Sequence, residues 1–287
     1  MSVRQGNTIE AAEVNAALRQ TRLGGSVLHL PEVDSTNDLA LEAAQGGARS
    51  GVWVADAQTA GRGRGSHAWH SAPGDGLYVS VLFTPQLPAT AGLPASLALT
   101  AGLAAWDAIR EVTGITADIR WPNDIVTRPV SPGSLERSRK LGGVLVEVAV
   151  GAPQPPPLHA MLRYAVIGIG INVAHRSFPP GLRDLASSLY LEGWQVPDRQ
   201  PLLIALLDKL DGYIRKEEGG YAGTEKGPGA RSRLPEASTW LRGKRVYVPE
   251  EGGYTGVTAG LDASGFLLVD GDDGRRHTVR SGGVREP

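Results

Sequence analysis

The sequence predicts an α+β protein, in which a mixed α/β domain to about residue 235 precedes a small β-barrel. Helix-like and strand-like segments alternate through the first domain. Two continuous Val- and Ile-rich runs, 141–150 and 164–173, are expected to be strands buried on both faces of a sheet. Beyond residue 244, four short strand-like runs are separated by Gly- and Asp-rich turns, which is typical of a small antiparallel barrel.

The remaining elements follow from local patterns. Apolar residues spaced at helical intervals predict a short amphipathic helix over 9–20. The stretch "DSTNDLALEAA" (34–44) places capping-type residues before an Ala- and Leu-rich run, so it predicts the start of a helix. Residues 216–238 are rich in Gly and charge and are expected to form a linker or mobile loop. Further strands are predicted over 26–33, 51–58 and 77–83 and in a short segment ended by Pro122, and further helices over 93–112 and 199–216.

The composition excludes several classes of protein and of site. The chain has 287 residues, 29 basic against 30 acidic, and its net charge of -1 argues against a broad nucleic-acid-binding surface. It has no cysteine, which excludes disulfides, thiolate metal sites and a catalytic thiol. No apolar run reaches the ~18–20 residues of a membrane span, and the N-terminus lacks the apolar segment of a secretory signal. We therefore expect a soluble cytoplasmic protein that does not contact a membrane.

The stretch "GRGRGS" (61–66) comes closest to a ligand-binding loop. Its glycines resemble the dinucleotide fingerprint, but Trp69 and Pro73 interrupt any following helix and the next regular element is a strand, so a Rossmann site is excluded. Glycines let a ligand approach the backbone, and Arg62 and Arg64 can each bind a phosphate or carboxylate through a planar guanidinium. A solvated basic turn is the alternative, and Trp69 could either close over a ligand or pack as an ordinary aromatic residue.

Four other motifs have both a structural and a functional interpretation. "DSTN" caps a helix or offers hydroxyl and amide groups to a small ligand. Asp124 in "RWPND" accepts a turn hydrogen bond or contacts a metal or hydroxyl group. Lys140 in "KLGG" is a surface residue or meets a ligand at the start of a central strand. The glycines of "IGIGINV" either allow tight sheet packing or let a ligand lie against the strand, with Asn172 offering an amide. The six histidines lack metal-binding spacing, and a Ser/His/Asp triad has no anchor.

The order and spacing of these motifs resemble those of the biotin–protein ligases. The resemblance extends over about residues 26–287. It implies a short N-terminal helical extension (1–25), a catalytic domain (26–235) with a mixed sheet like that of class II aminoacyl-tRNA synthetases, and an SH3-like C-terminal domain (236–287). The motifs that carry it are "DSTN" (34–37), "ADAQTAGRGRGSHAWHSAPGDGLYVS" (55–80), "RWPNDI" (120–125), "KLGGVLVE" (140–147) and "IGIGINV" (167–173).

The resemblance implies a two-step ligase that uses biotin and ATP. Biotin and MgATP would form biotinyl-5′-adenylate and pyrophosphate, and the activated carboxyl would then pass to a lysine of the biotin carboxyl carrier protein of acetyl-CoA carboxylase. Mg²⁺ would arrive with ATP, since the sequence shows no cluster of metal-ligating side chains. The residue types suit this chemistry, because two arginines and a lysine can neutralise the repulsion between two anions and proximity supplies much of the remaining acceleration.

Site residues carry over from the family motif by motif. Arg64, Lys140 and Asp124 would be the catalytic residues. The biotin-binding residues would be Ser35, Thr36, Asn37, Gln58, Arg62, Gly63, Arg64, Lys140, Gly142 and Gly143. The ATP- and adenylate-binding residues would be Arg62, Arg64, Trp69, Asp124 and Asn172, with Arg64 retaining the adenylate and Trp69 covering the ligand.

The chain departs from the family pattern at two places. The family loop usually continues "GRGRRGR", whereas this chain has Gly65 and Ser66 where an arginine and a glycine would stand, so the resemblance does not predict how this loop closes. Bifunctional members carry an N-terminal DNA-binding domain of about 60 residues, whereas about 25 residues precede the first predicted strand here. The resemblance therefore implies a monofunctional ligase that binds no DNA, and a homodimer formed through sheet edges is a further expectation.

Two other functions remain open from the residues alone. A lipoate–protein ligase would use the same kind of site with a different acid and acceptor. A non-enzymatic nucleic-acid-binding module would use the arginine loop and the barrel, although the near-neutral charge and the proline-broken loop speak against it.

Overall fold

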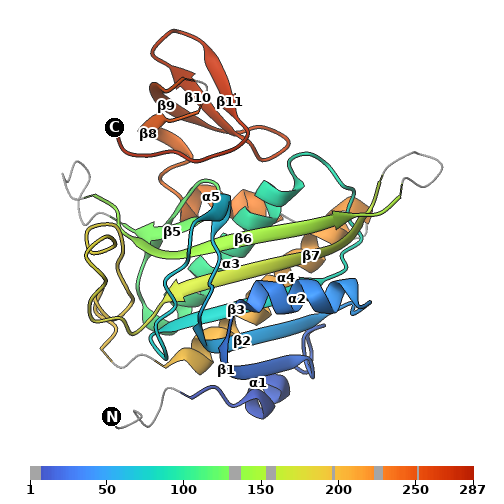
Figure 1. Ribbon diagram of the computed structural model, residues 1–287. Helices are drawn as coiled ribbons and strands as arrows, with labels where there is room; N and C mark the ends of the chain where they lie inside the picture. The colour runs from blue at the N-terminus through green and yellow to red at the C-terminus, as the bar shows by residue number, and fades with distance from the viewer. Residues whose placement is uncertain (1–7, 129–136, 153–159, 196–197, 223–228, 251) are drawn as a thin grey trace.

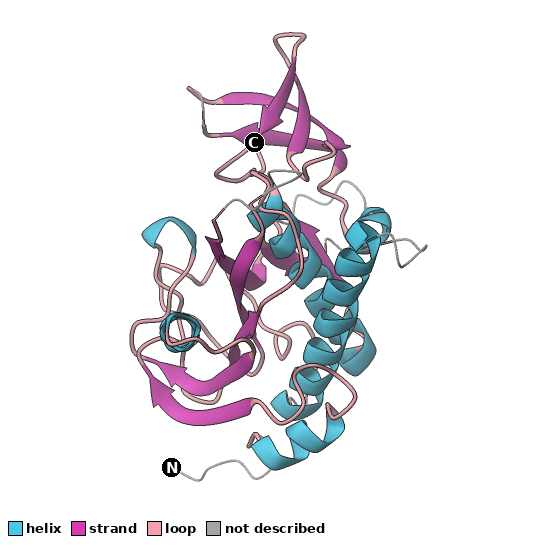
Figure 2. Ribbon diagram, turned by 90° about the vertical axis from the view of Figure 1, so that its right-hand side faces the viewer, coloured by secondary structure: helices cyan, strands magenta, loops and turns pink. Residues whose placement is uncertain are grey.

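A computed structural model shows a seven-stranded mixed sheet with helices on both faces, and a smaller C-terminal β-sheet packed at one end of it (Figure 1). It describes residues 8–128, 137–152, 160–195, 198–222, 229–250 and 252–287. Figure 2 shows the long helices together on one side of the large sheet. This arrangement leaves the opposite side, where a shorter helix and several loops lie, accessible for a binding site.

The large sheet has the strand order β1-β2-β3-β7-β6-β5-β4. The first pair is parallel because a helix crosses over between the two strands, and the other neighbours are antiparallel. All eight residues of β3 are buried, as expected for a strand near the centre of a covered sheet. The strands are β1 (Val27–Val33), β2 (Gly51–Gln58), β3 (Gly76–Phe83), β4 (Ala117–Arg120), β5 (Asp124–Thr127), β6 (Lys140–Val150) and β7 (Leu162–Asn172).

The helices cover the sheet from two sides. α3 (Leu93–Thr113) packs on β6 and β7 with α4 (Arg199–Ala222) beside it, whereas α2 (Thr36–Gln45) packs on β2 and β3. The short α1 (Ala11–Ala17) contacts β1 and α4. Ser35 caps α2 by accepting a hydrogen bond from the backbone N–H of Asp38 at 3.4 Å, as its capping-type sequence predicts.

Most predicted elements are confirmed, with three corrections. Residues 216–238 are not simply a linker: among the described residues, α4 continues to Ala222 and α5 (Ala230–Ala237) follows. The charges that suggested a loop are used in ion pairs, since Glu218 lies 2.6 Å from Arg22. β5 was not predicted, because its four residues follow the turn at Pro122 directly. In β6 only 141–144 are buried, and the strand becomes partly exposed beyond them.

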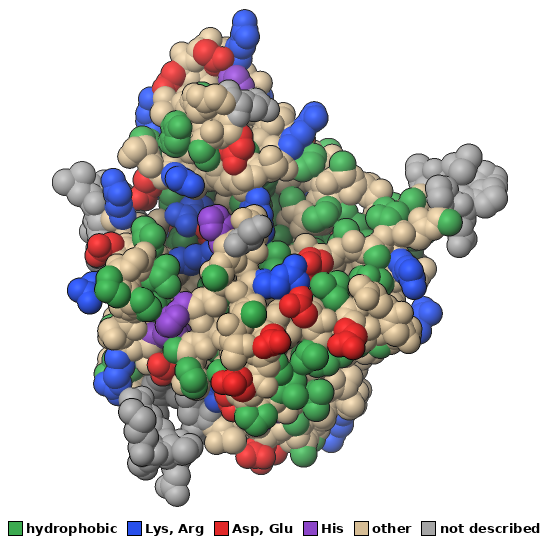
Figure 3. All heavy atoms as spheres, viewed as in Figure 1, with side chains coloured by type: hydrophobic (Ala, Val, Ile, Leu, Met, Phe, Trp, Pro, Cys, Tyr) green, Lys and Arg blue, Asp and Glu red, His purple; other side chains and the backbone are tan. Residues whose placement is uncertain are grey.

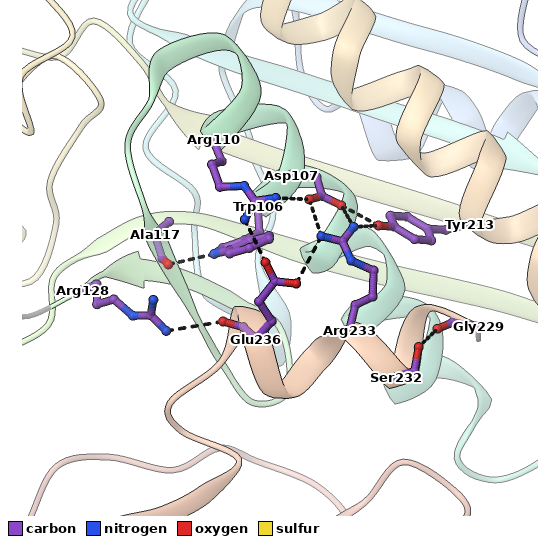
Figure 4. A network of polar contacts seen from close by, with 10 residues as sticks. All are labelled: Trp106, Asp107, Arg110, Ala117, Arg128, Tyr213, Gly229, Ser232, Arg233 and Glu236. Atoms are coloured by element: carbon purple, nitrogen blue, oxygen red, sulfur yellow. Dashed lines mark hydrogen bonds and ion pairs between the residues drawn. The ribbon is translucent and has the colours of Figure 1, made fainter. Parts of the chain in front are cut away.

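A polar cluster joins the three helices behind the sheet (Figure 4). Asp107 on α3 is buried and accepts hydrogen bonds from the Tyr213 hydroxyl on α4 at 2.5 Å and from Arg233 on α5 at 2.5 and 3.0 Å. Burial and the Asp107 carboxylate raise the pKa of Tyr213 to about 12. The cluster fixes α5 immediately before the chain enters the C-terminal sheet.

The C-terminal module is a four-stranded antiparallel sheet in the order β11-β10-β9-β8, which agrees with the predicted SH3-like domain. Several contacts join it and the preceding segment to the first domain. Among them, the Trp121 indole N–H donates to the Gly265 carbonyl at 3.2 Å, and the Asp118 carboxylate accepts from the Thr239 N–H at 2.9 Å. The predicted domain boundary after residue 235 falls inside α5 and stays a prediction. The strands are β8 (Arg242–Val248), β9 (Tyr254–Leu261), β10 (Leu267–Gly271) and β11 (Arg276–Val279).

In the part of the chain that the structure describes, every helix is too short or too polar to cross a membrane.

The Asp107 cluster gives a stability prediction. Asp107→Ala should lower the free energy of unfolding by about 2–4 kcal/mol, because it leaves the buried Tyr213 hydroxyl without its acceptor and removes the buried carboxylate partner of Arg233. Glu111→Ala, on the same helix, is the control: Glu111 is 57% exposed and its pair with Lys209 should contribute less than about 1 kcal/mol. Urea unfolding measures both. Equal midpoints for the two variants would show that the cluster is not stabilising.

Candidate active site

A small, partly open cavity lies on the face of the large sheet that carries α2. Its walls come from β2, β3, β6, β7, the start of α2 and the glycine loop. Figure 3 shows Lys and Arg side chains gathered in a hollow of this face below the C-terminal module. The structure brings the following predicted site residues together around the cavity: Ser35, Thr36, Asn37, Gln58, Arg62, Gly63, Arg64, Trp69, Lys140 and Gly143.

Three predicted site residues do not line this cavity. Asp124 lies behind Lys140, with its carboxylate 2.6 Å from the Lys140 ammonium. Gly142 lies inside the sheet, where a Cβ would come within 2.8 Å of the Gly170 carbonyl oxygen. The Asn172 amide donates to the Lys140 carbonyl at 3.2 Å and to the Ser187 carbonyl at 2.9 Å. Asp124 and Asn172 therefore contact Lys140 rather than the cavity itself.

Paired strands with a two-residue period form the floor of the cavity. Tyr78 and Ser80 of β3 face it, and in the register of β7 they lie opposite Gly170 and Gly168. A Cβ on Gly168 would lie 2.1 Å from the Asn37 amide oxygen, and one on Gly170 would lie 2.5 Å from the Trp69 ring. The glycines therefore leave space for side chains that approach from above the sheet.

These four floor residues were not predicted as site residues. The alternation in "LYVSV" and "IGIGI" contains the signal, because residues two apart on a strand share a face. Asn123 and Glu147 were missed as well, although both belong to quoted motifs. Which face of each strand meets the cavity follows from the strand order, which the sequence does not state.

A chain of hydrogen bonds connects the polar side chains of the cavity. The Ser80 hydroxyl lies 2.6 Å from the Asn37 amide oxygen and 2.8 Å from the Thr36 hydroxyl. The Thr36 backbone N–H donates to the Gln58 amide oxygen at 2.9 Å, so the Gln58 NH₂ group is directed at Ser71, 2.9 Å away. The network holds donors and acceptors in fixed positions, which suits a small ligand that has both.

The three predicted cations each have a different environment. Arg62 lies between Asp38 and Glu147, at 2.8 Å from the latter, and hydrogen bonding to Glu147 raises its pKa. Arg64 is largely desolvated, and burial lowers its pKa although nearby carboxylates oppose the shift. The Lys140 ammonium lies 5.3 Å from the centre of the Trp69 ring, within cation–π distance.

Asp124 remains ionised beside Lys140. Burial tends to raise its pKa, but Lys140 and Arg120 together outweigh that effect and hold the pKa below its ordinary value. Arg120 contributes a second ion pair at 2.7 Å. The carboxylate therefore keeps its charge at neutral pH and fixes the Lys140 ammonium at the end of the cavity.

The glycine loop folds back over the cavity as a closed turn. The Gly63 N–H donates to the His67 carbonyl at 2.7 Å, and the Trp69 N–H donates to the Gly61 carbonyl at 2.8 Å. Gly65 has a φ of 60°, a left-handed conformation that an arginine adopts only with strain. Gly65 therefore forms a turn that an arginine, which the family pattern leads one to expect at this position, would adopt only with strain.

The far end of the loop rests on a buried aromatic cluster. His70 lies 5.7 Å from the ring of His175, which stacks on Phe178 at 4.9 Å. Burial lowers the pKa of His175 to about 4, Asp75 opposes this shift, and His70 reinforces it. His175 is therefore neutral in the folded protein at neutral pH, and the loop is anchored on an uncharged surface.

The fold and the site together define a class of protein: a mixed-sheet domain with a small polar cavity, three cations at its mouth and an arginine–glycine loop across it. Residues 30–172 match the family model described as the biotin/lipoate A/B protein ligase family. The chain belongs to the biotin–protein ligases within this family. It is 32% identical to the bifunctional ligase/repressor BirA of Bacillus spizizenii, over 95% of this chain and 78% of that protein.

Two further comparisons agree. The biotin–[acetyl-CoA-carboxylase] ligase of Mycobacterium tuberculosis is 31% identical over 88% of this chain and 86% of its own length. The solved structure of the biotin protein ligase from Aquifex aeolicus in complex with biotin and ATP superposes with a TM-score of 0.68 and 27% identity, covering 91% of this chain and all of that one.

The buried His175 predicts a pH-dependent stability. Because its pKa falls from 6.5 to about 4 on folding, the unfolded chain binds more protons between these values, and stability decreases as the pH falls through that window. The contribution lost between pH 8 and pH 5 should be about 2 kcal/mol. Urea unfolding at both pH values measures it. This loss of stability should disappear in His175→Phe, which keeps an aromatic ring against Phe178. If the variant loses as much stability as the unaltered protein between the two pH values, other titrating groups are responsible.

Proposed function

We propose that this chain is an ATP-dependent biotin–protein ligase, which forms biotinyl-5′-AMP from biotin and MgATP and transfers biotin to a lysine of a biotin carboxyl carrier protein. The observation that carries the proposal is the convergence of separate sequence motifs on one cavity with a polar end and a cationic end. Its polar end suits a neutral ring with both donors and acceptors. Its cationic end suits a carboxylate that must meet a phosphate.

In the first step, a carboxylate oxygen of biotin attacks the α-phosphorus of ATP, and the bond to pyrophosphate breaks. Arg62, Arg64 and Lys140 are proposed to offset the repulsion between these anions and the charge that develops at phosphorus. Glu147 and Asp124 hold Arg62 and Lys140 in place before any ligand enters. The cations thus need little rearrangement when the anions bind.

In the second step, the neutral amine of the carrier lysine attacks the acyl carbon of the adenylate. An amide bond forms, the bond to AMP breaks, and the amine nitrogen releases a proton as AMP leaves. Asp124 is proposed to assist the incoming lysine, with Lys140 at the activated carboxyl. Trp69 is proposed to cover the ligand until the lysine arrives. Asn172 is proposed to act at the nucleotide side through the backbone of Lys140, to which its amide is bonded.

Magnesium is proposed to enter with the nucleotide. Among the described residues, no group of three or more His, Asp or Glu side chains could hold a metal ion. Mg²⁺ is commonly bound through substrate phosphates and one or two carboxylates, so a protein cage is not required. Dimerisation through the edge strands β1 or β4 remains a prediction.

A direct assay tests the function. The protein incubated with biotin, MgATP and a biotin carboxyl carrier domain should yield biotinylated carrier, detected by blotting and mass spectrometry. A carrier with its acceptor lysine changed to Arg is the control and should stay unmodified. Product with lipoate and a lipoyl domain but none with biotin would identify a lipoate–protein ligase instead. No product with either acid would favour the nucleic-acid-binding module.

Arg64→Gly should release the adenylate early. Removing a charge-assisted contact with the intermediate should raise its dissociation rate by about tenfold or more, so that free adenylate labels lysines of a bystander protein. Arg245→Gly is the control, because Arg245 is 56% exposed on β8 and pairs with Asp272. Dissociation of labelled adenylate, followed by rapid filtration, is the measurement. An unchanged lifetime in Arg64→Gly would remove the role assigned to this arginine.

A further inference from the structure

The Arg64 side chain connects the glycine loop with the C-terminal module. One end of its guanidinium donates to the Asn123 amide oxygen at 3.0 Å, and the other donates to the Gly282 carbonyl at 2.6 Å. Gly282 follows β11, so the contact joins residues that are 218 positions apart in the chain. Figure 1 shows the connection between β2 and β3 rising toward this module. The arginine proposed to retain the adenylate is thus held partly by a different sheet.

Glu250 lies next to Gly282, the residue whose carbonyl accepts from Arg64. Its carboxylate, just after β8, occupies the space next to Gly282, where a Cβ would come within 1.2 Å of one of its oxygens. The other oxygen, Oε2, is buried and has no hydrogen-bond partner among the described residues. A buried carboxylate oxygen without a hydrogen bond is unfavourable. Its charge, like that of Asp124, attracts the Arg64 guanidinium and opposes the lowering of the Arg64 pKa by burial.

Gly282 is needed for the same arrangement. Its φ of 67° lies in the left-handed region, which side chains adopt with strain. A side chain there would also displace the Glu250 carboxylate. The next residue, Gly283, has open space around its Cβ position and no left-handed φ, so the two adjacent glycines differ both in backbone conformation and in their surroundings.

The position of the guanidinium matters because it separates two cavities. Arg64, Asn123 and Val144 line both the ligand cavity and a second cavity, which extends to Phe266 and Arg280 of the C-terminal module. With Arg64 anchored on Gly282, the guanidinium stands at the boundary between the two. Loss of the anchor would let it swing away and open the ligand cavity toward the second one.

We propose that Glu250 is a positioning residue for Arg64, and that the C-terminal module uses its charge and the Gly282 carbonyl to hold this arginine over the activated intermediate. Glu250 acts through Arg64 and does not contact the substrate. The inference rests on the proposed function, since it concerns how long the adenylate stays bound. It assigns the C-terminal module a part in retaining the intermediate.

The test compares adenylate dissociation with adenylate formation. In Glu250→Gln, which keeps shape and removes charge, the adenylate should dissociate about three- to tenfold faster, the range expected for loss of one half-buried charge attraction. The rate of pyrophosphate release should fall by a smaller factor than the dissociation rate rises, because Arg62 and Lys140 keep their own carboxylate partners, and the melting temperature should not fall. Glu250→Asp keeps the charge and should recover much of the lifetime. Gly282→Ala should shorten the lifetime as Glu250→Gln does, whereas Gly283→Ala should not.

A combined variant separates positioning from a general structural role. In an Arg64→Gly background, Glu250→Gln should have no further effect, because its partner is already absent. Two results would overturn the inference without affecting the proposed ligase activity. The first is an unchanged rate of adenylate dissociation in Glu250→Gln. The second is that Glu250→Gln accelerates dissociation as much in the Arg64→Gly background as it does alone. If the unaltered protein forms no adenylate from biotin and MgATP, the proposed function fails, and the inference fails with it.

Discussion

The absence of side chains at the centre of the large sheet is the constraint on which the rest of the site depends. β7 places Gly168 and Gly170 between β3 and β6, where Gly170 pairs with Tyr78 on one side and with Gly143 on the other. Adjacent glycines in register leave a shallow trough in an otherwise crowded surface. Asn37 from α2 and Trp69 from the loop fill part of it from above, and the remaining space is the cavity.

The cations at the mouth of this trough are organised before a ligand is present. Arg62 and Lys140 each have a carboxylate partner, on β6 and β5, and Arg64 is held by an amide and a carbonyl oxygen. Side chains that are already desolvated and oriented lose little entropy when an anion binds. The same contacts connect the loop to β6 and to the C-terminal module, so the shape of the loop depends on both sheets.

Much of the fold and the site could be predicted from local sequence. Strand and helix positions follow from apolar patterns, and the motifs that resemble the ligase family contain most of the residues around the cavity. The prediction was weakest where tertiary contacts override composition. The charged segment after residue 216 continues as helix because Glu218 pairs with Arg22 and Tyr213 is buried against Asp107. In each of these two pairs the residues are more than 100 positions apart in the sequence.

The sequence by itself determined the chemical groups of this protein: two arginines and a lysine for anions, hydroxyl and amide side chains for a polar ligand, and glycines where backbone must be approached. Only the tertiary structure decided which of them meet. Strand order brings Tyr78 and Ser80 to the cavity and leaves Asp124 behind Lys140, and the packing of the second sheet places Glu250 and Gly282 at Arg64. The physical reason is that a strand's pattern shows which residues share a face, whereas the neighbour of that face depends on long-range pairing.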